Sequence, residues 1–169
     1  REFVLLDYTY CAGVQSSDGH QWTDSGFVND YLERQLVAGY PRSYPSAKDD
    51  PGADMLNFAS SGFIWDNVLA HGKTFRNYGE WLTSDAGWAD PAKTGKPGWR
   101  DFWQDYRQGT KHTRLGCHPA IESLRPHSKL DGIGWDLNVP DQLRADKFIE
   151  ELKAFEAKGD LPNFIILFL

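Results

Sequence analysis

The sequence predicts an α/β fold with a largely parallel sheet flanked by helices. Two continuous apolar runs, residues 3–6 and 163–169, are typical of strands that are covered on both faces. Segments with helical periodicity lie between these runs. The predicted order is strand, helix, helix, strand, insert, helix, strand, and this alternation favours a parallel sheet.

The first predicted strand leads into a turn, Ser16-Ser-Asp-Gly-His20, and a helix follows at once. Apolar residues continue at helical spacing as far as Leu36. Gly39 and Pro41 follow and end the predicted helix. Residues 40–62 are rich in Pro, Gly, Ser and Asp, which predicts a long loop.

The second half of the chain has clearer signals. Ser60 or Ser61 is expected to cap a short helix that ends at Gly72. Residues 73–78 alternate as a strand does, whereas residues 83–135 show no sustained period and are predicted to be an irregular insert. Pro140 opens the clearest helix, and the last strand follows its end at Gly159.

Composition limits the function classes. The 169 residues are expected to form a single partial domain, because the chain begins and ends within predicted strands, as a piece of a longer protein would. A net charge of −6 without a basic run argues against nucleic acid as the main partner. No apolar run is long enough to span a membrane. Cys11 and Cys117 would pair in an exported protein and stay separate thiols in a cytosolic one.

The turn after the first predicted strand carries the main candidates for chemistry. Ser16 and Ser17 lie where a strand meets a helix, and a helix N-terminus attracts anions, so either hydroxyl is a candidate nucleophile. An N-cap role explains the same position equally well. Asp18 and His20 are candidates for phosphate contact, acid catalysis or metal binding, and Asp18-Gly19 also suits a plain bend.

Other polar residues give weaker signals. Glu80 follows a predicted strand, where loops of α/β proteins collect functional groups. Three histidines in the insert lack any recognised metal-ligand spacing, and scattered surface histidines are the simpler interpretation: His112, His118 and His127.

Three stretches together resemble the phosphoesterase family of the alkaline-phosphatase superfamily, in particular its bacterial exported members of the phospholipase C and acid phosphatase type. The first is Phe3-Val-Leu-Leu-Asp-Tyr8 with Ser16-Ser-Asp-Gly-His-Gln-Trp22. The second joins residues 62–72 to Phe75-Arg-Asn-Tyr-Gly-Glu80, and the third joins residues 139–144 to 161–167.

This resemblance implies a metal-dependent phosphoesterase that acts on a small phosphate ester through a phospho-serine. Ser16 matches the family nucleophile, Ser17 is the alternative, and residues 18–20 would frame the phosphate. A divalent metal is implied as cofactor, but its identity is left open between zinc, calcium and magnesium. The family's metal motifs would lie before Arg1 and after Leu169, so the chain alone is expected to be inactive. A periplasmic or secreted location is implied as well.

Two other functions remain open. A catalytically inactive homologue would be a binding module whose aromatic insert stacks on sugars, through Trp81, Trp88, Trp99, Trp103 and Tyr106. A metal-free serine hydrolase is the third possibility, although the G-x-S-x-G pattern is absent.

Overall fold

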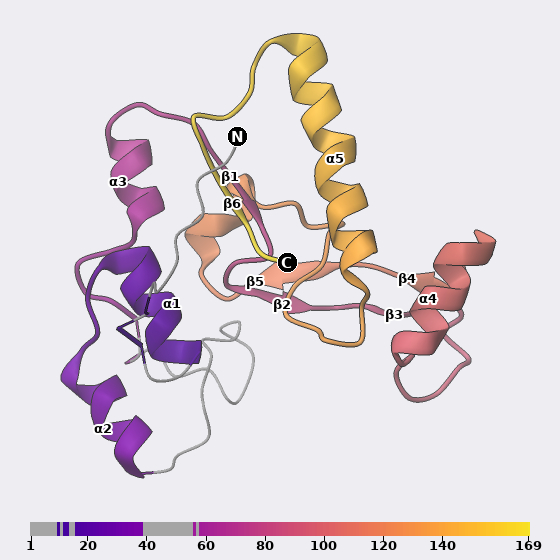
Figure 1. Cartoon of the computed structure of the whole chain (residues 1–169), viewed down its shortest axis with the longest axis horizontal. Helices are drawn as coiled ribbons and strands as arrows, with labels where there is room; N and C mark the ends of the chain where they lie inside the picture. Colours follow the sequence, from indigo (N-terminus) through magenta and orange to yellow (C-terminus); the bar gives the residue numbers. More distant parts are fainter. Residues whose placement is uncertain (1–9, 11, 14–15, 39–55, 57) are drawn as a thin grey trace.

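Short strands and five α-helices make up the described part of the chain in this computed structural model (Figure 1). The structure describes residues 10, 12–13, 16–38, 56 and 58–169. The helices are α1 (Ser16–Ser25), α2 (Asp30–Ala38), α3 (Ile64–Ala70), α4 (Trp99–Gln108) and α5 (Asp141–Lys158), with a 3₁₀ helix, η2 (Glu122–His127). The strands are β1 (Phe75–Tyr78), β2 (Leu82–Ser84), β3 (Gly87–Trp88), β4 (Thr113–Arg114), β5 (Cys117–Pro119) and β6 (Phe164–Leu167).

The strands β1 and β6 form a parallel pair that is covered on both faces (Figure 1). Side chains of β1 alternate between these faces. Arg76 and Tyr78 point to α5, where both bond the carboxylate of Glu151. Phe75 faces the other way and stacks on Trp65 of α3, with ring centroids 6.0 Å apart. Helices on both faces of a parallel pair are the local arrangement of α/β proteins.

Aromatic rings build the core next to this pair. Phe63 stacks on Trp65 with ring centroids 4.5 Å apart, and Trp81 packs against Phe63 at 5.4 Å. Leu124 of η2 closes the cluster. Trp65 and Trp81 are fully buried, and each such side chain stabilises the fold by roughly 1.5–3 kcal/mol or more.

A second, smaller core lies under α4 and α5. It joins Phe102 of α4 to Leu143 of α5 through Ala86, Ile133 and Val139. The antiparallel pairs β2–β5 and β3–β4 lead from the first core to this one. In Figure 1 these strands run from the β1–β6 pair to α4, at the end of the molecule far from α1.

Several predicted elements are confirmed. The predicted short helix is α3, and the strand predicted after it is β1. The long helix predicted after Pro140 is α5, and the last predicted strand is β6. Gly72 and Gly159 follow the helices with φ of +66° and +71°, a left-handed conformation that glycine adopts most readily. The predicted caps of α3 were wrong, because its N-cap is Phe63, whose N–H donates to Asp66.

Three predictions differ from the structure. The expected turn at residues 16–20 is the first part of α1, and the expected single helix is divided into α1 and α2 near Gly26, where φ is +64°. The insert is not irregular, because residues 83–135 contain α4, η2 and strands that pair with each other. The first predicted strand, residues 3–6, and most of the predicted loop lie outside the described residues.

The predicted sheet is only partly seen. One of the three two-stranded sheets among the described residues is parallel, and the other two are antiparallel. A largely parallel, alkaline-phosphatase-like sheet therefore stays a prediction. Among the described helices, none is both long and apolar enough to cross a bilayer.

Candidate metal centre

Helix α1 carries two potential metal ligands on one face. His20 and Asp24 are four residues apart, a spacing that brings side chains together along a helix. Asp24 is 3% exposed, and the His20 side chain is 18% exposed. The helix therefore delivers an imidazole and a carboxylate to the interior from one element.

The turn after β1 supplies the third group, Glu80. Gly79 has φ of +107°, and a Cβ added there would lie 3.0 Å from the side chain of Phe168, so the turn needs glycine. The side chain of Asn77 spans this turn: its Oδ1 accepts from the Glu80 N–H at 3.1 Å, and its Nδ2 donates to the Glu80 carbonyl at 2.7 Å. These bonds hold Glu80, which is 4% exposed, at the carboxyl end of β1.

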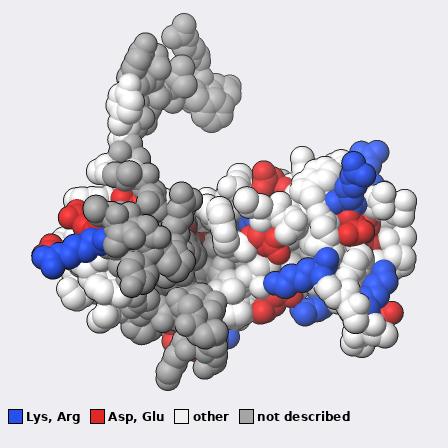
Figure 2. Space-filling model, turned by 90° about the horizontal axis from the view of Figure 1, so that it is seen from below, with Lys and Arg blue, Asp and Glu red and all other residues white. Residues whose placement is uncertain are grey.

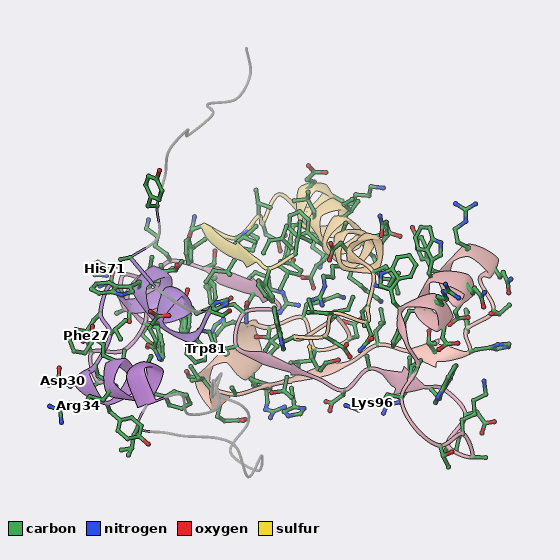
Figure 3. All side chains as sticks on the ribbon, turned by 60° about the horizontal axis from the view of Figure 1, so that its bottom comes forward. Phe27, Asp30, Arg34, His71, Trp81 and Lys96 are labelled. Carbon is green, nitrogen blue, oxygen red and sulfur yellow. The ribbon has the colours of Figure 1, made fainter. Side chains whose placement is uncertain are left out.

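This turn contacts α1 at two points. The Nδ1 atom of His20 lies 2.6 Å from Oε1 of Glu80. The indole N–H of Trp81 donates to Oδ2 of Asp24 at 2.6 Å. Figure 3 shows Trp81 inside the molecule, close to α1. Glu80 and Trp81, which are adjacent in one turn, thus position His20 and Asp24 of α1.

The strand β6 ends at the same place. The Phe168 N–H donates to the carbonyl of Tyr78 at 2.9 Å, and its ring packs edge-on against His20 with centroids 5.6 Å apart. The carboxyl ends of parallel strands are where α/β proteins commonly place their ligands.

His20, Asp24 and Glu80 together form a group that is able to hold a metal ion. Each offers one ligand atom, and these atoms lie within 4.8 Å of one another. One imidazole nitrogen and two carboxylate oxygens suit Zn²⁺ or Mn²⁺, whereas Ca²⁺ takes six to eight oxygen ligands. Among the described residues, this is the one cluster of metal-ligating groups.

Electrostatics favour a cation here. Burial, with the charge of nearby Glu80, raises the pKa of Asp24 to about 8. Burial alone would lower the pKa of His20, but the hydrogen bond and charge of Glu80, helped by Asp24, outweigh it and raise that pKa. Two buried carboxylates repel each other when both are ionised, and a bound cation would remove this cost.

A cleft of about 450 Å³ lies beside Asp24, the one member of the cluster among its lining residues. It lies between the end of α1 and the start of α3, and its lining includes Trp22, Asp24, Ser61 and Asn67. Its size falls within the range of small-molecule sites, so Asp24 has an approach for a ligand.

The predicted site residues of the first turn have different surroundings. Ser16 is the first residue of α1 and is exposed, while the side chain of Ser17 lies outside the described part. Asp18 is 4% exposed, and its carboxylate accepts from the N–H of Gly19. A Cβ added at Gly13 would lie 2.5 Å from Gly19, so the two backbones touch closely.

The structure also corrects the aromatic set that was expected to bind sugars. Trp81 is fully buried and cannot stack on a ligand at the surface. Trp88 packs under Lys93, with the ammonium 3.9 Å from the ring centroid. Trp99, Trp103 and Tyr106 remain together along α4, with successive ring centroids 5.6 and 5.7 Å apart.

The cysteines and insert histidines stay outside the cluster. Cys117 is a buried free thiol, and burial raises its pKa to about 12; Cys11 lies outside the described residues. His118 bonds Asp85 at 2.7 Å.

Comparisons with protein-family models, curated proteins and solved structures find no match to this chain. The candidate site therefore rests on its own geometry. The sequence offered Asp18 and His20 as possible metal ligands, placed the family's metal motifs beyond both ends of the chain, and missed Asp24. The four-residue spacing of His20 and Asp24 would have indicated the pair, but His20 was assigned to a turn that is in fact the first part of α1.

Proposed function

We propose that this chain is the metal-dependent phosphoesterase domain of a protein that hydrolyses small phosphate esters. The observation that carries the proposal is the buried group of His20, Asp24 and Glu80. Two of its members, His20 and Asp24, lie on the helix that begins with Ser16, and Asp24 lines a cleft of ligand size.

The start of α1 supports a role for Ser16 as nucleophile. Helix N-termini present backbone N–H groups and a positive dipole end, which favour a bound phosphate. Ser16 is exposed there, and His20 follows one helical turn later. With Nδ1 held by Glu80, the imidazole has a fixed orientation, as a base or a ligand requires.

The reaction has two balanced steps. The Ser16 oxygen forms a bond to phosphorus while the ester oxygen leaves, and the serine proton is passed on to the departing alcohol. Water then attacks the phospho-serine, which restores the hydroxyl and releases inorganic phosphate. A bound divalent metal would lower the serine pKa and neutralise charge on the phosphoryl oxygens.

The decisive experiment is turnover of p-nitrophenyl phosphate by the chain supplied with Zn²⁺ or Mn²⁺. Ser16→Ala should lower kcat/KM on the order of 10³-fold or more, because it removes the covalent step. Ser123→Ala is the matched control, since this exposed serine of η2 lies outside both the cluster and the cleft.

Three results would count against the proposal. Turnover that survives Ser16→Ala but is lost in Ser17→Ala would move the nucleophile by one position. Activity that is insensitive to chelators and is labelled by a fluorophosphonate would favour a metal-free serine hydrolase. An inactive chain that binds neither metal would leave no support for phosphoester hydrolysis by the His20 cluster.

A further inference from the structure

A second pocket is lined by Phe168, whose ring also packs against His20. It has a volume of about 190 Å³, and its lining includes Trp99, Trp135, Asp136, Asp141, Arg144 and Phe168. These residues come from the start of α4, the segment before α5, the first turns of α5 and the end of β6. None of them belongs to the candidate metal cluster.

The pocket combines flat apolar surfaces with fixed polar groups. Trp99 and Trp135 are each 45% exposed, and Trp135 is held by stacking on Phe168 with ring centroids 5.5 Å apart. Ring faces of this kind suit the C–H faces of a sugar. The aromatic row of Trp103 and Tyr106 continues from Trp99 along α4.

The polar groups are positioned by bonds within the protein. Oδ1 of Asp136 accepts from the backbone N–H and side-chain amide of Asn138 at 2.9 and 3.1 Å, and Oδ2 accepts from the Ser84 hydroxyl at 3.4 Å. Asp141 has a side chain that is 74% exposed, with an oxygen 3.6 Å from Nε of Arg144. Both carboxylates therefore retain lone pairs that a ligand hydroxyl is able to bond.

The charge of the pocket argues against an anion. Arg144 is 8% exposed, and its guanidinium donates to the carbonyls of Gly134 and Asp136 at 3.0 and 2.8 Å. The two carboxylates outnumber this single, already bonded cation, so a phosphate or acidic sugar would be repelled. A neutral ligand rich in hydroxyl groups matches the acceptors and the rings together.

We propose that this pocket binds a neutral saccharide unit between Trp99 and Trp135. Its volume is below the range of about 300–1,000 Å³ for drug-sized ligands, which limits the occupant to a group of about one ring. Longer chains would extend over the aromatic face of α4. The binding itself requires neither metal nor turnover.

The test is NMR titration of the ¹⁵N-labelled chain with cellotetraose, maltotetraose and N-acetylchitotetraose. Indole signals of Trp99 and Trp135, assigned with Trp→Phe variants, should shift saturably with at least one sugar. A ligand of about one ring should bind with a dissociation constant on the order of 1 mM. Trp99→Ala and Trp135→Ala should each weaken binding about tenfold, the loss of roughly one stacking contact. Trp88→Ala, which lies outside the pocket, should not change the affinity.

Asp136→Asn changes the charge of the pocket with little change of its shape, and it should also weaken sugar binding. Because this variant should stay folded, weaker binding would report a lost contact with the sugar and not unfolding of the chain. Ser16→Ala should bind as the parent chain does, so failure of the catalytic proposal and failure of this one are distinguishable. Absence of shifts with all three sugars at about 20 mM, twentyfold above the expected constant, overturns the proposal. Shifts that persist in both tryptophan variants, or that occur with phenol and not with sugars, overturn it as well.

Discussion

Gly134 lies where the segment before α5 crosses β2, and its lack of a side chain makes that crossing possible. A Cβ at this position would lie 2.4 Å from the carbonyl oxygen of Leu82 and 2.6 Å from the carbonyl carbon of Thr83. Trp135 donates its N–H to the same Leu82 carbonyl at 2.8 Å. The backbone contact that positions Trp135 therefore depends on the absence of a side chain at Gly134.

We predict that Gly134→Ala destabilises the protein by about 2 kcal/mol or more, because the backbones must separate to admit a methyl group. For a chain of this size, thermal unfolding should shift down by about 4–8 °C. Gly98→Ala is the control, since an added Cβ there would meet only the Asp101 carboxylate at 3.8 Å. Equal unfolding temperatures for the two variants would contradict the close approach at β2.

At the scale of elements, Asp105 joins α4 to β4. Its carboxylate accepts from the hydroxyl of Thr110, the N–H of His112 and both the N–H and hydroxyl of Thr113. Burial alone would raise the pKa of Asp105, but these donors outweigh it and lower that pKa well below its ordinary value. The ionised form therefore stabilises this end of the molecule.

The sign of the pH dependence follows from that lowered pKa. An ordinary aspartate in the unfolded chain has a pKa of about 3.9, so the stabilisation by Asp105 is present above about pH 4 and is lost as the pH falls further. Asp105→Asn should cost about 1–3 kcal/mol at pH 7, and thermal unfolding between about pH 5 and 2 should then vary less with pH. Asp146→Asn changes one exposed acceptor of the Tyr106 hydroxyl from a carboxylate to an amide oxygen and should change neither property much. A parent chain whose unfolding temperature is constant over this range would refute the prediction.

At the scale of the whole molecule, the candidate metal centre connects parts that are distant in sequence. His20 and Glu80 are 60 residues apart, and Phe168 closes the site from the end of the chain. A metal bound by His20, Asp24 and Glu80 would bind the folded chain far better than the unfolded one. Metal binding should therefore stabilise the whole fold.

We predict that Zn²⁺ or Mn²⁺ at about 100 times its dissociation constant adds about 2.7 kcal/mol of stability, which raises the unfolding temperature by about 5–10 °C. Asp24→Asn should abolish most of this increase, and a chelator should reverse it. His118→Ala is the control, because its Asp85 partner lies outside the cluster. An equal increase in the Asp24 variant would place the metal elsewhere.

Local patterns predicted the elements that depend on local sequence. The apolar spacing and terminal glycines of α3 and α5 were sufficient, as was the alternation in β1. α4 was missed because its ten residues, although amphipathic, stand in a segment of mixed Gly, Pro, Trp and charges that shows no sustained period as a whole. Phe102 is its one apolar residue in the core.

The candidate site was predictable only in its parts. The sequence by itself singled out Ser16, His20 and Glu80, since a helix start and a strand end are recognisable locally. Only the tertiary structure brought Glu80 to His20, Trp81 to Asp24, and Trp99 to Trp135. The physical reason is that the first two contacts depend on how α1 packs against the turn after β1, and the pocket shared by Trp99 and Trp135 depends on how α4 lies against the segment before α5. No spacing within a single element encodes that packing.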